Sequence, residues 1–142
     1  MYSAQHTRPK MPTGSCLCKA IKYTYSGDPG MILCHCIPCR RLTGSLFSTN
    51  VLIPQGDFTW SGMPKTKSRP GDSGKNITLH FCADCGTTVF EKAASFPGII
   101  ILMGGTLDDG LLDDMAPVEE IYVKSRVKWL PKVCAVQKQL GM

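Results

Sequence analysis

The stretch Phe81-Cys82-Ala83-Asp84-Cys85-Gly86 is a short knuckle with two cysteines three positions apart and a glycine after the second. Such a knuckle offers two sulfur ligands to one metal ion. Another close pair, Cys16 and Cys18, lies much earlier in the chain, just before a predicted strand. Together the two pairs supply four thiolates, the ligand set of a closed structural zinc site. We therefore expect this zinc to clamp two distant segments and to stabilise the fold.

The middle cluster, Cys34-His35-Cys36-Ile37-Pro38-Cys39, contains three further cysteines and no fourth to close it. Either His35 or a distant group supplies a fourth ligand, or the site is open. Ligation by His35 is strained because both of its neighbours in sequence are ligands, so a supporting or surface position is the stronger expectation. An open zinc site binds water or substrate and lowers the pKa of a bound water or thiol. The sequence thus predicts two zinc ions per chain, one structural and one catalytic.

The N-terminal residues lack the apolar run of a secretory signal, which predicts a cytoplasmic location. In a reducing compartment, clustered cysteines hold metal more often than they form disulfides. The alternative is a secreted disulfide scaffold, which a chain of 142 residues with 43% hydrophobic residues does not need for a stable core. The longest apolar run, residues 96–103, is interrupted by Pro97 and Gly98, so no membrane span is predicted.

Length and composition predict a single domain. We expect residues 1–13 to be a flexible tail, residues 14–131 the domain, and residues 132–142 a C-terminal tail. The net charge of +5 is too mild to indicate nucleic-acid binding and is compatible with a small anionic substrate. Residues 61–76 are basic and rich in Pro, Gly and Ser, and we interpret them as a solvated loop.

Alternating apolar and polar residues predict a mainly β fold. The expected strands cover residues 20–25, 31–34, 48–53, 58–61, 77–81, 87–91, 99–103 and 120–123. One short helix is expected at residues 36–43, since Pro38 suits a first helical turn and Gly44 suits the position just past a helix end. A weaker helix is expected at residues 111–115. Many short strands with few helices favour antiparallel sheets.

Four ordered motifs, over about residues 14–129, resemble the glutathione-dependent formaldehyde-activating enzyme family, also called the CENP-V/GFA domain. They are Gly14-Ser15-Cys16-Leu17-Cys18, Cys34-His35-Cys36-x-x-Cys39-Arg40-Arg41-x-Thr43-Gly44, Phe81-Cys82-x-x-Cys85-Gly86-Thr87 and Gly105-Thr106-Leu107-Asp108-Asp109. The resemblance implies an Mss4-like fold of antiparallel sheets around a structural zinc. It also implies a second zinc on Cys34, Cys36 and Cys39, and glutathione as co-substrate in the reversible formation of S-hydroxymethylglutathione.

Other candidate site residues follow the middle cluster. Arg40 and Arg41 suit the binding of a carboxylate of an anionic thiol, although a solvated helix face explains them equally well. Thr43, Gly44 and Phe47 would extend the same wall. Asp108 and His35 are candidates for proton transfer; a turn at a strand end explains Asp108 at least as well.

These observations lead to a zinc- and glutathione-dependent carbon–sulfur lyase or transferase that acts on a small carbonyl compound or another electrophile. The expected partners are glutathione and that electrophile, with no membrane partner, and a homo-oligomer stays open. The alternative, from another class, is a non-catalytic, zinc-stabilised protein-interaction or chaperone module. In that case the middle cluster would be closed or empty.

Overall fold

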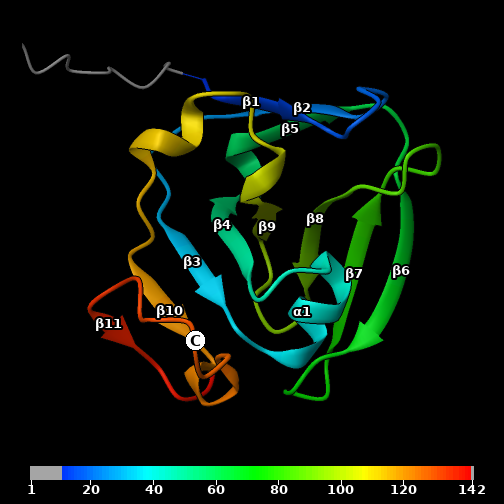
Figure 1. The fold of residues 1–142 in the computed structure, drawn as a ribbon. Helices are drawn as coiled ribbons and strands as arrows, with labels where there is room; N and C mark the ends of the chain where they lie inside the picture. Colours follow the sequence, from blue (N-terminus) through cyan, green and yellow to red (C-terminus); the bar gives the residue numbers. More distant parts are fainter. Residues whose placement is uncertain (1–10, 142) are drawn as a thin grey trace, which may run out of the picture.

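The computed structural model describes residues 11–141, which form two β-sheets and one short α-helix (Figure 1). The predicted mainly β fold is confirmed. The smaller sheet has the order β1 (Thr13–Ser15), β2 (Lys22–Tyr25), β5 (Phe58–Ser61). The larger has the order β11 (Val136–Gln137), β10 (Glu119–Ile121), β3 (Met31–Cys34), β4 (Ser48–Pro54), β9 (Ile99–Met103), β8 (Thr88–Ala93), β7 (Asn76–Phe81), β6 (Lys65–Pro70). Most of the predicted N-terminal tail lies outside the described residues.

The pairing is antiparallel except at one edge of the larger sheet, where β10 runs parallel to both β3 and β11. The connection from β9 passes through the 3-10 helices η2 (Gly104–Thr106) and η3 (Leu111–Asp114) before β10 begins. This long connection lets the chain return in the direction of β3, since parallel neighbours need a crossover. The helix expected at residues 111–115 is the 3-10 turn η3.

The predicted loop over residues 61–76 is wrong at residues 65–70, which form the edge strand β6 against β7. Strand β6 has the sequence KTKSRP and is largely exposed, so it lacks the apolar alternation by which strands are recognised. Lysine and proline are typical of edge strands because they discourage further pairing.

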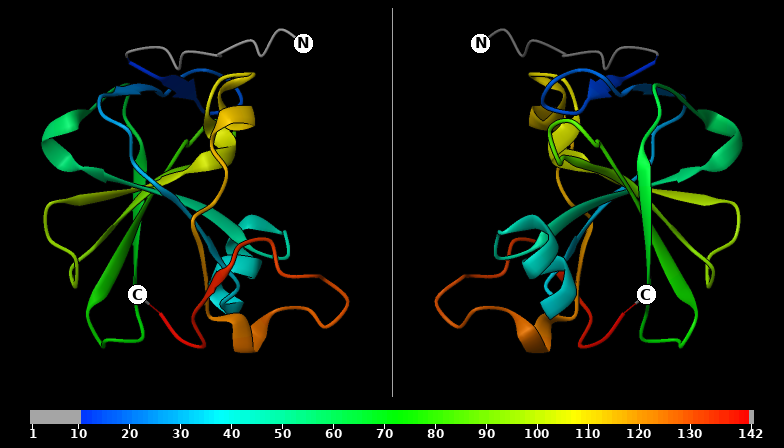
Figure 2. Two further views of the ribbon diagram at one scale, coloured as in Figure 1. Left: turned by 90° about the vertical axis from the view of Figure 1, so that its left-hand side faces the viewer. Right: turned by 90° about the vertical axis from the view of Figure 1, so that its right-hand side faces the viewer.

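The sequence predicts a C-terminal tail at residues 132–142, of which the structure describes residues 132–141. Its strand β11 pairs with β10, and Cys134 within it is buried. The backbone N–H of Tyr122 donates to the carbonyl of Leu140 at 3.0 Å. Figure 2 shows this segment at the end of the molecule away from β1, the end at which the helix α1 (Ile37–Thr43) also lies. The segment is therefore part of the folded unit.

The main core lies between the two sheets. Tyr25 and Phe58 from the smaller sheet pack against Val51, Phe90 and Leu102 from the larger one. The opposite face of the larger sheet carries two smaller apolar clusters. Along β9, Ile100 and Leu102 point to the main core, so the intervening Ile101 points to the other face. The candidate site lies on that second face.

The helix α1 begins and ends as the sequence predicts. The Sγ of Cys36, at the N-cap, accepts a hydrogen bond from the backbone N–H of Cys39 at 3.3 Å. Gly44 ends the helix with φ at 64°, a left-handed conformation that glycine adopts without steric cost. Among residues 11–141, no helix is long and apolar enough to cross a membrane.

Candidate functional site

The first cluster brings together the sulfur atoms of Cys16, Cys18, Cys82 and Cys85, all within 4.8 Å of one another. The Sγ of Cys18 lies 3.7 Å from those of both Cys16 and Cys82. Four thiolates at about 2.3 Å from a tetrahedral zinc lie about 3.8 Å apart, so this cluster fits the ion. The geometry joins the segment before β2 to the turn after β7.

The knuckle that holds Cys82 and Cys85 is built from local hydrogen bonds. The N–H of Cys82 donates to the carbonyl of Thr87 at 2.9 Å, and the N–H of Gly86 donates to the carbonyl of Cys82 at 2.9 Å. The hydroxyl of Thr87 lies 3.2 Å from the Sγ of Cys85. Hydrogen bonds from Thr87 are the main reason that the pKa of Cys85 is lowered to about 5. The knuckle thus favours a thiolate, the form that binds metal.

The second cluster consists of Cys34, Cys36 and Cys39, whose sulfur atoms also lie within 4.8 Å of one another. Cys34 ends β3, Cys36 caps α1 and Cys39 lies in its first turn. Hydrogen bonds from the thiols of Cys34 and Cys39 lower the pKa of Cys36 to about 3. Within residues 11–141, no fourth Cys, His, Asp or Glu joins this group. The three sulfurs fit a zinc ion with one position left open.

A cavity of about 450 Å³ opens beside this three-sulfur cluster. Its floor is the second face of the larger sheet, and its walls come from α1, the turn after β6, the loop after β8, Tyr122 and the C-terminal segment. The lining residues that matter below are Cys34, Cys36, Cys39, Asn50, Arg69, Asp72, Glu91, Tyr122 and Leu140. Cavities of this size hold small ligands.

The sequence analysis did not identify three polar residues that line the cavity. Glu91 is 4% exposed and Asn50 is 8% exposed, and Glu91 Oε1 and Asn50 Oδ1 have no hydrogen-bond partner among residues 11–141. Arg69 comes from the edge strand β6. Burial raises the pKa of Glu91, and the positive charge of Arg69 opposes this shift. The available signal was an acidic residue that interrupts an apolar strand, although a single such residue forms no motif.

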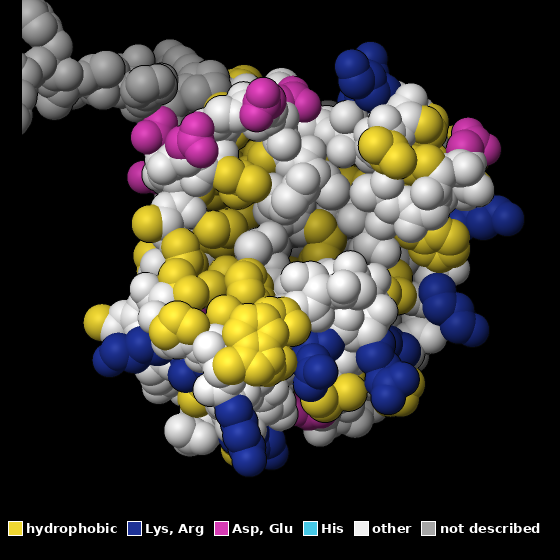
Figure 3. Space-filling view, in the orientation of Figure 1, with side chains coloured by type: hydrophobic (Ala, Val, Ile, Leu, Met, Phe, Trp, Pro, Cys, Tyr) yellow, Lys and Arg dark blue, Asp and Glu magenta, His cyan; other side chains and the backbone are white. Residues whose placement is uncertain are grey.

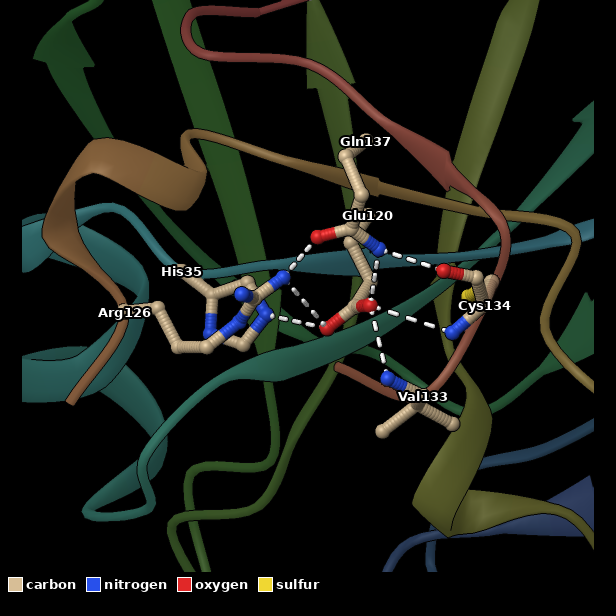
Figure 4. A network of polar contacts seen from close by, with 6 residues as sticks. All are labelled: His35, Glu120, Arg126, Val133, Cys134 and Gln137. Atoms are coloured by element: carbon tan, nitrogen blue, oxygen red, sulfur yellow. Dashed lines mark hydrogen bonds and ion pairs between the residues drawn. The ribbon is translucent and has the colours of Figure 1, made fainter. Parts of the chain in front are cut away.

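His35 lies outside the three-sulfur cluster. Successive residues point to opposite sides of an extended chain, so its ring turns away from the cavity that Cys34 and Cys36 line. Its Nε2–H donates to Oε1 of Glu120 at 2.8 Å, and both side chains are fully buried (Figure 4). The ring also packs against Phe47, with ring centres 5.5 Å apart. His35 thus connects the cysteine loop to β10.

Glu120 is the centre of a buried polar network (Figure 4). Its Oε2 accepts hydrogen bonds from the backbone N–H groups of Val133 at 2.8 Å and Cys134 at 3.1 Å, and from the side-chain amide of Gln137. Arg126 Nη2 lies 3.4 Å from Oε1. Burial alone would raise the pKa of Glu120, yet these hydrogen bonds lower it to about 2. The carboxylate therefore ties the C-terminal segment to β10.

The predicted glutathione contacts lie on other surfaces. Arg40, Arg41 and Gly44 line a separate hollow of about 360 Å³ on the outer side of α1. Thr43 and Phe47 line another hollow, of about 430 Å³, beside the zinc knuckle. None of these five lines the cavity of the three-sulfur cluster. Cys39 is buried against the sheet, whereas Arg41 is exposed, Arg40 is half-buried, and both arginines line the outer hollow.

Asp108 is also remote from the three-sulfur cluster. Its Oδ2 accepts a hydrogen bond from the Thr13 hydroxyl at 2.5 Å, and its backbone N–H donates to the Thr13 carbonyl at 3.0 Å. These contacts hold it beside β1, whereas α1 lies at the opposite end of the molecule (Figure 1).

In Figure 3, Lys and Arg side chains gather mainly on the lower part of the surface, around α1 and the C-terminal segment, and acidic side chains gather at the top.

Comparison with known proteins agrees with this geometry. The sequence model of the glutathione-dependent formaldehyde-activating enzyme family matches residues 11–125. A crystal structure of a Rhodobacter sphaeroides protein from structural genomics has a similar fold, with a TM-score of 0.58 and 19% identity over 76% of this chain and 98% of that chain. No curated protein matches the sequence. The family match covers most of the chain and both cysteine clusters, and the chain therefore belongs to the glutathione-dependent formaldehyde-activating enzyme family.

Proposed function

We propose that this chain is a zinc- and glutathione-dependent carbon–sulfur lyase or transferase that joins the glutathione thiol to a small carbonyl compound, with formaldehyde as the first candidate. The observation that carries the proposal is the three-sulfur cluster at the wall of a cavity of about 450 Å³. Family membership supports the same chemistry. The four-sulfur cluster would hold the structural zinc.

Zinc on Cys34, Cys36 and Cys39 would supply an open coordination position that favours the thiolate form of an incoming thiol. The chain's own residues orient the rest of the substrate. Arg69 offers a guanidinium inside the cavity, where it would pair with a carboxylate of glutathione. Asn50 Oδ1, buried without a partner, would accept a hydrogen bond from the peptide part of the ligand.

Arg40 and Arg41 would act from outside the cavity. They lie on α1, which also holds Cys39, and basic side chains gather at this end of the molecule (Figure 3). A one-sided positive potential attracts anions and raises their rate of encounter. We therefore propose that these arginines steer glutathione and that Arg69 binds it. All eight cysteines are free, which suits a reducing cytoplasm as the proposed location.

Exchange NMR with ¹³C-formaldehyde and glutathione tests the proposed function directly. The zinc-loaded protein should speed the interconversion of free formaldehyde and the hemithioacetal above the spontaneous rate. Cys36→Ser should return exchange to the spontaneous rate while the protein stays folded. Calorimetry should show heat of glutathione binding to the wild-type protein. Exchange at the spontaneous rate together with no binding heat would contradict the proposal.

The binding-module alternative has one specific observation in its favour. Trp129, Val133 and Val136 of the C-terminal region are 72%, 53% and 48% exposed. Exposed apolar side chains suit contact with another protein. That function would need only the structural zinc, so it predicts one zinc ion per chain and no thiol-dependent heat. Metal analysis therefore separates the two functions.

A further inference from the structure

We propose that Glu91 is the acid–base residue of the cavity. It would protonate the carbonyl oxygen when the carbon–sulfur bond forms and remove the same proton when that bond breaks. This inference rests on the proposed function and names the residue that moves the proton. Of the two residues that the sequence suggests for this role, Asp108 lies beside β1 and far from the three-sulfur cluster, and His35 is bound to Glu120 away from the cavity.

The position of Glu91 in the sheet is unusual for a carboxyl group. In the register of the sheet it lies between Leu79 of β7 and Ile101 of β9, so both of its neighbours on this face are apolar. It is 4% exposed, and its Oε1 has no hydrogen-bond partner in the part of the chain that the structure describes. A buried polar atom without a partner costs folding free energy. Because Glu91 also lines the cavity, a substrate group bound there would supply the partner that this oxygen lacks.

Lys67 of β6 lies in the same cross-strand row as Leu79 and Glu91. The charged and titratable groups that line the cavity together with Glu91 come from several elements. They are Arg69 on β6, Asp72 in the following turn, Tyr122 after β10, and Cys34, Cys36 and Cys39 from β3 and α1. Asp72 is exposed to solvent, and Glu91 is not. Burial favours the neutral acid at Glu91, and Arg69 keeps the carboxylate form accessible. Both forms are needed for a reversible proton transfer.

The chemical step balances without an added oxidant or reductant. The sulfur lone pair of the glutathione thiolate attacks the carbonyl carbon, and the carbon–sulfur bond forms. The π electron pair of the carbonyl moves to oxygen, which takes the proton of the Glu91 carboxyl and becomes a hydroxyl. In reverse, the Glu91 carboxylate removes that hydroxyl proton, the carbonyl re-forms, and the thiolate leaves with the bonding pair. Water restores the proton on Glu91 after each addition.

The test compares Glu91→Gln with the wild-type protein in the formaldehyde–glutathione exchange assay. The amide has the shape of the acid but cannot donate an acidic proton. We expect the catalysed rate to fall by about 100-fold or more. Zinc content and glutathione binding heat should be unchanged. Glu91→Asp should recover at least about a tenth of the lost rate, because it keeps an acid. Asp57→Asn, an exposed carboxyl in the 3-10 turn η1 (Gln55–Asp57), is the control and should keep the wild-type rate.

Two further readouts separate proton transfer from packing. The ratio of wild-type to Glu91→Gln forward rates should fall as pH rises through the pKa of Glu91, since only the protonated acid donates. Infrared difference spectra on product binding should contain a carboxylic-acid band that Glu91→Gln lacks. If Glu91→Gln does not fold, Glu91→Met also removes the carboxyl group. Its apolar side chain suits the neighbouring Leu79 and Ile101.

The failures of the two proposals are distinguishable. If wild-type protein accelerates exchange and Glu91→Gln stays within about threefold of it, the role of Glu91 is overturned and the function stands. A ratio of wild-type to Glu91→Gln forward rates that does not change with pH would also overturn the role of Glu91 and leave the function standing. If wild-type protein neither binds glutathione nor accelerates exchange, the proposed function falls, and the role of Glu91 falls with it.

Discussion

His35 Nε2 lies 2.8 Å from Glu120 Oε1, with both side chains fully buried. This contact joins the residue between two cysteines of the three-sulfur cluster to a carboxylate that also binds the C-terminal segment through Val133, Cys134 and Gln137. The same segment places Leu140 and Gly141 on the cavity wall. One buried carboxylate thus links the cysteine loop and the opposite wall of the cavity.

Glu120→Gln should lower the free energy of unfolding by about 2–4 kcal/mol, because the amide replaces one of two oxygens that accept from several donors and removes the charge. Chemical denaturation of zinc-loaded protein measures this effect. The matched control is Glu119→Gln. Glu119 Oε2 lies 3.0 Å from Nζ of Lys138, a half-exposed side chain. The control should change stability by less than about 1 kcal/mol. Equal losses in the two variants would contradict the role of the network.

The contribution of Glu120 should depend on pH. Its pKa in the folded protein is about 2, below its ordinary value of 4.5. A lowered carboxyl pKa stabilises the fold above the unfolded-state value, and that contribution is lost as pH falls through the folded-state value. The stability difference between wild type and Glu120→Gln should therefore shrink by up to about 3 kcal/mol between pH 4.5 and pH 2. A difference that stays constant over this range would refute the assignment.

The two cysteine clusters should respond differently to substitution. Cys82→Ser removes one ligand of the site that joins the region before β2 to the turn after β7, so we expect loss of the cooperative melt and of soluble protein. Cys36→Ser should bind one zinc ion per chain in place of two and should melt near the wild-type temperature. Metal analysis and thermal melts check both variants. Equal unfolding of the two would show that the clusters share one structural role.

Substitutions of Arg69 and Arg40 should distinguish direct binding of glutathione from its long-range electrostatic attraction. Arg69→Met removes the guanidinium inside the cavity, and we expect the KM for glutathione to rise about tenfold at all salt concentrations. Arg40→Met, on the outer side of α1, should raise KM about twofold at low salt, and the effect should disappear at high salt. Initial rates at two ionic strengths check the pair. A larger effect from Arg40 would place the carboxylate outside the cavity.

Local sequence spacing was enough to predict some parts of the molecule. The helix at residues 36–43 follows from Pro38 and Gly44, and most strands follow from apolar alternation. Both signals depend on a few neighbouring residues. By contrast, β6 carries charges on an exposed edge, and β11 is two residues long, so neither has a periodic pattern.

The sequence by itself determined which sulfur donors exist and which lie close together, because cysteines two or three positions apart reach one ion in almost any fold. The grouping of the two distant pairs followed from the four donors that a closed zinc site needs. Only the tertiary structure decided which other side chains face those sulfurs. Arg69, Glu91 and Asn50 come from β6, β8 and β4, and they meet at one cavity because strand register places them on the same face of the sheet. Register and facing depend on pairing between distant segments, which adjacent residues do not encode.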